Sequence, residues 1–285
     1  MPKKGTPAAK SGQKLGQHFL FDGAILERIA DTAGLTADDV VLEIGPGPGG
    51  LTEVLARRAG RVVAVELDSG LIPRLQERMT GYDNFTLVQG DILRVNLQEL
   101  WQEQLGGRPF KVVANLPYYI TTPILMALLE SDLPVVSLTV MVQKEVADRL
   151  VAPPGGREYG AISVAVQWRT VARRAFLVPA GAFVPPPRVE SAVLHLVVRQ
   201  EPAVPVADPA LFRQVVRVCF TARRKTLRNN ISLGFGLGGE DAAALLQSAG
   251  IDPGDRAERL GLPEFAALTD AVAHWKNGME NKIVQ

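Results

Sequence analysis

The chain has 285 residues, enough for one large domain and a smaller second one. An apolar share of 47% with 21% charged residues is typical of a globular protein with a full core, and the net charge of +1 excludes a uniformly polybasic protein. Cys219 is the only cysteine, which excludes an intramolecular disulfide and a cysteine-based metal site. We see no apolar stretch of membrane-spanning length and no secretory signal, and we expect a cytoplasmic protein without a metal.

The predicted elements begin after a lysine-containing tail, residues 1–14, which we expect to be flexible. From residue 40 onward, short β-branched runs alternate with helical patterns. The predicted strands are 40–44, 61–65, 85–89, 111–114 and 135–142, and the predicted helices between them are 50–58, 69–79 and 122–129. Apolar runs of this kind are typical of a parallel sheet that is covered on both faces. The alternation therefore predicts a Rossmann-like α/β fold with its site at the carboxyl ends of the strands.

The second half of the chain changes character. A helix is predicted over 159–168, followed by a strand pair over 170–178 and 191–198 and a Pro- and Ala-rich linker over 201–209. Beyond the linker the pattern is helical, over 211–220, 225–233, 241–248 and 263–275. We therefore predict an α/β domain over residues 15–200 and a small all-α domain over residues 201–285.

A glycine-rich loop directly follows the first predicted strand of the sheet. Gly45, Gly47 and Gly50 fit the pattern G-x-G-x-x-G, and Glu66 lies near the acidic position that binds a ribose in dinucleotide sites. Glycines let the backbone approach a ligand closely. The loop alone is therefore compatible with a nicotinamide or flavin enzyme.

Three features favour a different cofactor. Pro46 and Pro48 remove N–H groups that a pyrophosphate would use, and Asp91 follows the next strand in a position suited to an adenine amino group. The third is Asn115, at the end of the fourth strand. Together they indicate S-adenosylmethionine, which has a ribose and an adenine but no phosphate. The alternative is that Glu66 and Asp91 only cap turns or helices.

The run after the fourth strand is suited to accept a planar exocyclic amine. Two hydrogen-bond acceptors would favour a pyramidal nitrogen, and the candidates are Asn115 Oδ1 and the main-chain carbonyl of Leu116 or Pro117. Tyr118 would stack on the base, with Phe183 as a possible second wall. The alternative is that the tyrosine is a core aromatic and Asn115 a cap.

A basic stretch in the predicted helical domain is the candidate RNA contact. It contains Arg223, Arg224, Lys225 and Arg228 without an acidic residue among them. Such a cluster can bind phosphates and offset the cost of unstacking a base, although a charge run is often only a solvated face.

These motifs, in this order, resemble the ribosomal RNA adenine N6,N6-dimethyltransferases nearly end to end. The shared stretches are LGQHFL (15–20), EIGPGPGG (43–50), VELD (65–68), GD (90–91), NLPY (115–118), QKEV (143–146), FVPPPRVES (183–191) and FTARRKTLRN (220–229). The resemblance implies an S-adenosylmethionine pocket that uses His18, Leu20, Gly45, Glu66, Asp91 and Asn115 and releases S-adenosylhomocysteine. It also implies transfer of two methyl groups to each of two neighbouring adenosines in a hairpin near the 3′ end of 16S rRNA, in an assembling 30S subunit and by a monomeric enzyme.

Position 18 departs from the family, which often has asparagine there. A main-chain contact would tolerate His18, whereas a side-chain role would be in doubt. Two other functions remain open: a large-subunit rRNA adenine N6-methyltransferase of the macrolide-resistance type, and a non-catalytic RNA-binding assembly or transcription factor. The basic stretch and the long helical tail favour the small-subunit enzyme, and the intact run from Asn115 to Tyr118 favours catalysis.

Overall fold

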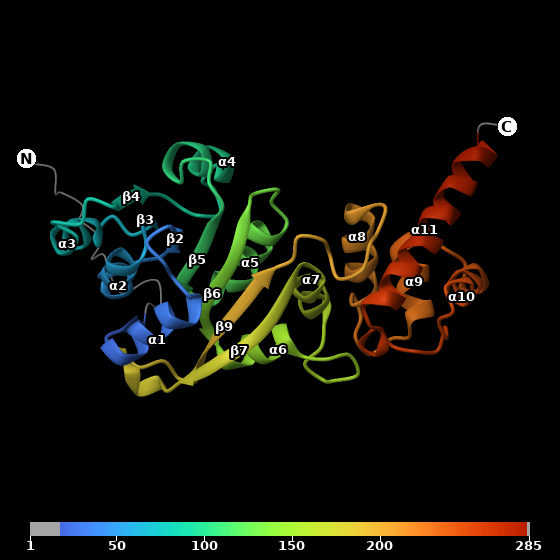
Figure 1. The fold of residues 1–285 in the computed structure, drawn as a ribbon. Helices are drawn as coiled ribbons and strands as arrows, with labels where there is room; N and C mark the ends of the chain where they lie inside the picture. Colours follow the sequence, from blue (N-terminus) through green and yellow to red (C-terminus); the bar gives the residue numbers. More distant parts are fainter. Residues whose placement is uncertain (1–17, 284–285) are drawn as a thin grey trace, which may run out of the picture. The chain divides into compact units, whose positions relative to one another are not determined.

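The computed structural model describes residues 18–283 (Figure 1), so the predicted tail over residues 1–14 lies outside the described part. The contacts divide the chain into two compact units. The first holds the chain as far as Lys144 together with Ala175–His195, and the second holds Glu145–Arg174 and the chain from Leu196 onward. Residues 145–174, which the predicted boundary at residue 200 assigned to the α/β domain, therefore group by contacts with the C-terminal helices.

A seven-stranded mixed sheet carries the predicted Rossmann-like fold, which is confirmed. Its strand order is β4-β3-β2-β5-β6-β9-β7, and β4, β3, β2, β5 and β6 are parallel. The strands are β2 (Val40–Ile44), β3 (Arg61–Glu66), β4 (Phe85–Gln89), β5 (Phe110–Asn115), β6 (Val135–Gln143), β7 (Thr170–Val178) and β9 (Ser191–Val198). Every predicted strand is present, with ends that differ by no more than one residue.

Helices cover the sheet on both sides (Figure 1). The strand order runs one way from β2 to β4 and the other way from β2 to β6, so right-handed crossovers place α2 and α3 on one face and α4 and α5 on the other. The helices of this unit are α1 (Gly23–Ala33), α2 (Gly50–Arg58), α3 (Ile72–Arg78), α4 (Leu97–Glu99) with a π-helical turn (Leu100–Gln104), and α5 (Thr121–Leu129). Helix α1, which the sequence analysis did not predict, packs with α2 and with strands β5 and β6.

One core of this unit lies between one face of the sheet and the helices α1 to α3. Ile29 of α1, Leu55 of α2 and Leu75 of α3 are fully buried with Val41 and Val113 of the sheet. Deleting a side chain of this kind typically costs about 2–5 kcal/mol. The core therefore fixes the backbone from which the loops at the strand ends extend.

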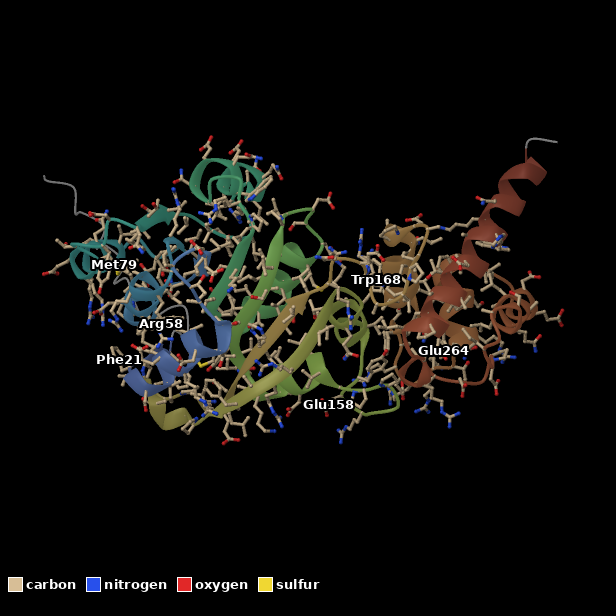
Figure 2. All side chains as sticks on the ribbon, viewed as in Figure 1. Phe21, Arg58, Met79, Glu158, Trp168 and Glu264 are labelled. Carbon is tan, nitrogen blue, oxygen red and sulfur yellow. The ribbon has the colours of Figure 1, made fainter. Side chains whose placement is uncertain are left out.

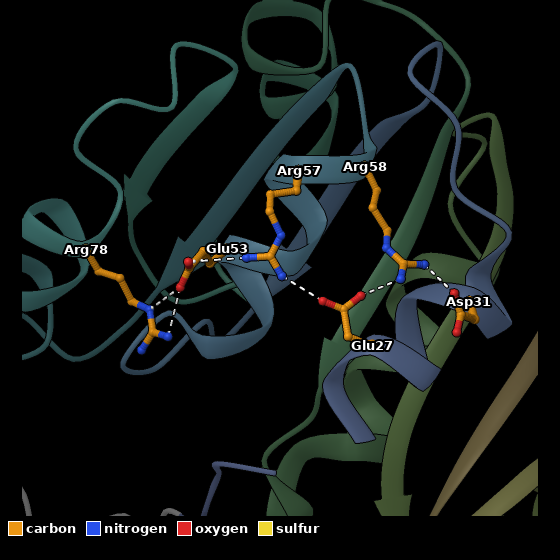
Figure 3. A network of polar contacts seen from close by, with 6 residues as sticks. All are labelled: Glu27, Asp31, Glu53, Arg57, Arg58 and Arg78. Carbon is orange, nitrogen blue, oxygen red and sulfur yellow. Dashed lines mark hydrogen bonds and ion pairs between the residues drawn. The ribbon is translucent and has the colours of Figure 1, made fainter. Parts of the chain in front are cut away.

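Ion pairs link the same three helices on their outer side (Figure 3). Arg57 of α2 contacts Glu27 of α1 at 2.7 Å and Glu53 at 3.3 Å, and Arg78 of α3 contacts Glu53 at 2.9 Å. Arg58 pairs with Glu27 and Asp31 of α1. The hydrogen bond from Arg57 holds the pKa of the Glu27 carboxyl below its usual value. Because these side chains are well exposed, each pair contributes little, and the network mainly fixes the helices relative to one another.

The second unit is helical, with its own core. Its helices are α6 (Lys144–Val151), α7 (Ala161–Arg169), α8 (Pro209–Cys219), α9 (Leu227–Phe235), α10 (Gly239–Ser248) and α11 (Leu262–Ile283). Trp168 of α7, labelled in Figure 2, packs on Phe212 of α8 with ring centroids 4.7 Å apart. Within the described part of the chain, no helix has both the length and the apolar character needed to cross a membrane.

Candidate active site

A pocket opens at the carboxyl ends of β2, β3, β4 and β5, where the strand order reverses. Counted with its open mouth and the solvent in it, the pocket encloses about 800 Å³. Ligands of open α/β sheets bind at this point because loops from both directions diverge there. Its lining residues come from five segments: His18 and Phe19; Ile44, Gly45 and Gly47; Val65 to Leu67; Gly90 to Ile92; and Asn115 to Ile120.

The glycine loop is held against the end of β3. Gly47 has a φ of +57° and donates its N–H to Glu66 Oε2 at 3.0 Å. A Cβ at Gly47 would lie only 2.9 Å from the Phe19 ring, so a side chain fits neither the dihedral nor the space. Gly45 donates to the Val65 carbonyl at 2.9 Å. Glycine at position 47 is therefore required by the packing of the loop against Phe19, and the loop backbone lines the pocket.

Two acids predicted to bind the cofactor lie in this pocket. Glu66 is 4% exposed, and its second oxygen accepts the Asp68 N–H at 2.8 Å. Asp91 accepts the Leu93 N–H at 3.0 Å and lies 3.5 Å from Arg94. These bonds orient both carboxylates, and each oxygen keeps a lone pair for a further donor, such as a ribose hydroxyl or an adenine amino group. Among the described residues, no group of His, Cys, Asp and Glu side chains is arranged to hold a metal ion.

A third acid, Glu43, lies at the end of β2 and was not singled out in the sequence. It is 1% exposed, and its Oε2 has no hydrogen-bond partner in the described part of the chain. Burial raises the pKa of Glu43 to about 8, and the nearby Glu66 carboxylate adds to this shift. Glu43 is therefore a neutral acid under the loop at pH 7. A sequence cannot distinguish such an acid from an exposed one.

This burial makes the stability depend on pH. The pKa of Glu43 rises from 4.5 to about 8 on folding, so between these values the folded protein holds a proton that the unfolded chain releases. The stability contribution is complete below pH 4.5 and is lost as the pH rises toward 8, by a few kcal/mol. In urea unfolding from pH 5 to pH 8.5, we expect Glu43→Gln to lack this loss. A parallel pH dependence in both proteins would contradict the prediction; Glu77→Gln, at an exposed position of α3, is the control.

The predicted acceptor corner is assembled at the end of β5. The Asn115 side chain donates through Nδ2 to the main-chain carbonyl of His18 at 3.3 Å. A carbonyl oxygen can only accept a hydrogen bond, so the amide must present its NH2 group to it, which leaves Oδ1 as the acceptor. Oδ1 accepts no hydrogen bond from the residues that the structure describes. The contact of His18 with Asn115 is thus made by the main chain, which tolerates histidine in place of asparagine.

The two predicted main-chain acceptors differ in their surroundings. The Pro117 carbonyl already accepts the Ile120 N–H at 3.2 Å and the Thr121 hydroxyl at 3.1 Å. Leu116 is fixed by its own N–H, which donates to Met141 of β6 at 3.1 Å. The Leu116 carbonyl is therefore the better candidate for the second acceptor.

Tyr118 is half-buried beside this corner. Its hydroxyl lies 2.6 Å from Ser191 Oγ, and its ring lies 5.9 Å from the His18 ring with the two planes 28° apart. His18 Nδ1 is in turn 2.8 Å from the Pro185 carbonyl. Burial raises the pKa of Tyr118, so the phenol stays neutral at physiological pH. The ring is thus a fixed, uncharged surface suited to stacking.

Two predicted site residues do not line the pocket. Leu20 and Phe183 face each other in a two-stranded pair of β1 (Phe19–Leu20) and β8 (Phe183–Val184), and both side chains are buried in the core. Phe183 is 2% exposed, so the structure does not present it as a second wall for a base. Phe19 and Tyr119, which the prediction did not include, line the pocket instead.

The basic stretch forms the loop between α8 and α9 and the start of α9. Arg223 donates to the main-chain carbonyls of Arg157 and Tyr159, so it holds a loop of its own unit. Arg224, Lys225 and Arg228 are exposed and have no ion pair within the described residues. Asn230 fixes the loop by donating to the Cys219 carbonyl at 2.7 Å. Three of the four predicted cations are therefore available to an external anion.

The pocket fits S-adenosylmethionine. Glu66 and Asp91 present oriented carboxylate oxygens to hydroxyl and amino donors, and Gly45 and Gly47 line the pocket with backbone in the left-handed region. When bound, this cofactor supplies an electrophilic methyl group on a sulfonium. Sheet order, glycine loop and paired acids thus define the class of S-adenosylmethionine-dependent methyltransferases with a Rossmann-like fold.

Comparison with known proteins narrows the class. Residues 8–273 match the family described as ribosomal RNA adenine dimethylase. The chain therefore belongs to the ribosomal RNA adenine dimethylase family, S-adenosylmethionine-dependent enzymes that act on rRNA adenines. It is 48% identical to the ribosomal RNA small subunit methyltransferase A of Bacillus licheniformis and 47% identical to that of Bacillus mycoides, in each case over 91% of this chain and 90% of the relative.

Two solved structures share the fold. A dimethyladenosine transferase from Plasmodium falciparum superposes with a TM-score of 0.74 at 24% identity, over 88% of this chain and 96% of that one. The 23S rRNA methyltransferase ErmE superposes with a TM-score of 0.66 at 29% identity, over 90% of this chain and 99% of that one.

The role of Glu66 can be tested by calorimetry with S-adenosylhomocysteine. The two carboxylate oxygens of Glu66 accept the N–H groups of Gly47 and Asp68. In Glu66→Gln one of these oxygens becomes an NH2 group, which cannot accept a hydrogen bond from a main-chain N–H. Loss of charge-assisted bonds to the ribose should weaken binding by about 10- to 100-fold. Glu77→Gln on the exposed side of α3 should bind as the wild type does. Unchanged affinity in Glu66→Gln would make Glu66 a purely structural residue.

Proposed function

We propose that this protein transfers methyl groups from S-adenosylmethionine to the N6 amines of two adjacent adenosines in the hairpin near the 3′ end of 16S rRNA. The observation that carries the proposal is the directed amide of Asn115, whose Nδ2 is bonded to His18 and whose Oδ1 is left as an acceptor at the pocket. An acceptor at that place suits an amine with hydrogens to donate.

The residues at the end of β5 have separate roles in this reaction. An aromatic amine is a poor nucleophile because its lone pair is delocalised into the ring. Asn115 Oδ1 and the Leu116 carbonyl would hold its two hydrogens and favour a pyramidal nitrogen, and the lone pair could then point at the methyl group. Pro117 shapes the turn, and Tyr118 would stack on the base. The nitrogen becomes acidic once it is alkylated, so water can take the proton and no strong base is needed.

The cofactor-binding roles follow the same pocket. Glu66 would hold the ribose and Asp91 the adenine amino group. Gly45 would let the cofactor approach the backbone closely. His18 supports the site through its carbonyl, whereas Leu20 and Phe183 contribute from the core and take no ligand in this proposal.

The choice of the small subunit rests on similarity. Identity is 47–48% to relatives named as small-subunit enzymes and 29% to the 23S enzyme ErmE. A non-catalytic RNA-binding factor would not need the directed Asn115 amide. We further propose that the substrate is the rRNA of an assembling 30S subunit, that Arg224, Lys225 and Arg228 contact its phosphates, and that the enzyme is a cytoplasmic monomer without a metal.

The test is to map methylated adenines in total rRNA from cells with and without this protein. We expect two adjacent N6,N6-dimethyladenosines in small-subunit rRNA to disappear with the protein and return with a plasmid copy. Loss of a single large-subunit mark would instead support the macrolide-resistance type of enzyme. No change in either rRNA would refute the proposal.

A further inference from the structure

The aromatic residue next to Tyr118 is placed quite differently. Tyr119 lines the mouth of the same pocket, and it is 58% exposed. It has neither a hydrogen bond nor a ring contact to any residue in the described part of the chain. Tyrosine is enriched at binding interfaces, where the ring can be covered by a ligand while the hydroxyl stays in water.

The backbone that carries this ring is fixed. Tyr119 is the central residue of a 3₁₀ turn (Tyr118–Ile120). This turn is closed by the bond from the Ile120 N–H to the Pro117 carbonyl and continues into α5. The ring is therefore presented to solvent from a rigid position, so ordering it on binding costs little backbone entropy.

Other exposed apolar side chains belong to a segment bonded to the same corner. Val184 is 60% exposed and Val189 is 46% exposed. The segment is tied to the corner at Pro185, through the His18 ring, and at Ser191, through the Tyr118 hydroxyl. This segment therefore adds exposed apolar surface outside the residues that line the pocket.

We propose that Tyr119 is a positioning residue, a stacking platform for the nucleobase adjacent to the adenosine that occupies the pocket. Turning one base out of a stack leaves its neighbour without a partner on that side, and an aromatic ring at the pocket mouth can replace that partner. The inference rests on the proposed function. Because the two target adenosines are adjacent, the base on Tyr119 would be one target while the other reacts.

The test compares Tyr119→Ala and Tyr119→Phe on undermethylated 30S subunits. Base–aromatic stacking is worth about 1–3 kcal/mol, so alanine should raise KM for the subunit by about 5- to 150-fold. Phenylalanine keeps the ring and should stay within about twofold of the wild type. The affinity for S-adenosylhomocysteine should be unchanged in both variants. A lower affinity would indicate that the substitution has damaged the pocket itself. Phe21→Ala is the control, since Phe21 is 50% exposed and does not line the pocket.

A second measurement reports the stack itself. The probe is a hairpin with the sequence of the rRNA target that carries 2-aminopurine in place of the neighbouring adenine. The fluorescence of the 2-aminopurine should be quenched by the wild type and by Tyr119→Phe but not by Tyr119→Ala. Wild-type KM in Tyr119→Ala would overturn the inference while leaving the proposed function intact. A wild-type protein that methylates no small-subunit adenine would instead refute the proposed function itself.

Discussion

Replacing Asn115 by alanine should lower the rate of methyl transfer to 30S subunits by at least about 100- to 1,000-fold, the effect of removing one well-placed polar group from a transition state. The variant loses the Oδ1 acceptor and the bond from Nδ2 to His18. The amine would then keep its planar, delocalised form. The rate is measured as labelled methyl groups transferred at saturating cofactor and subunit.

Two measurements separate this effect from a damaged pocket. 30S subunits should bind Asn115→Ala within about threefold of the wild type, because the acceptor acts mainly on the reacting amine. Asn277→Ala, at an exposed position of α11, removes the same group elsewhere and should keep full activity. Substantial methylation by Asn115→Ala would remove Asn115 from the reaction.

Neutralising Arg224, Lys225 and Arg228 together should weaken RNA binding by about 50- to 150-fold at 0.15 M salt, if each contacts one phosphate. The slope of log affinity against log salt should become shallower by about 2–3 for the same reason. Arg223 is left in place, because its bonds to the Arg157 and Tyr159 carbonyls make it part of its own unit. Binding is measured by salt titration with glutamine at the three positions.

A control variant removes two positive charges from the surface elsewhere. Arg74 of α3 and Arg173 of β7 are exposed, and Arg74→Gln with Arg173→Gln should leave the slope nearly unchanged. An equal fall in both variants would indicate a general effect of net charge, and an unaltered slope in the triple variant would exclude the basic stretch from phosphate contact.

The sheet was predictable because its strands are short runs rich in β-branched residues, such as Val40, Val41 and Ile44 in β2. Helix α1 has a comparable signal that was missed: Asp22 accepts the N–H groups of Ala24 and Ile25 at its start, and Leu26 and Ile29 lie on one face. The two-residue strands β1 and β8 have no periodicity to detect. They form because distant segments meet in the folded chain.

The site was predictable where chemistry is carried by residue type, as at Glu66, Asp91 and Asn115, which the structure brings to one pocket. The site was not predictable for residues whose role depends on where the side chain lies in the folded chain. Phe183 has the right ring for a base but is buried in the core. Tyr119 directly follows the acceptor run, but the sequence does not show that its ring is exposed at the pocket mouth. Arg223 looks like its neighbours but is bonded within its own unit.

The bond between the Asn115 amide and the carbonyl of His18 has a consequence for judging distant homologues. A peptide oxygen is common to all twenty amino acids, so evolution can exchange the side chain at residue 18 without erasing this support. Divergence at that position is then a poor sign that this contact is lost, although the contacts of the His18 ring with Tyr118 and the Pro185 carbonyl would change with it. A shift in the path of the main chain there would be a far more telling one.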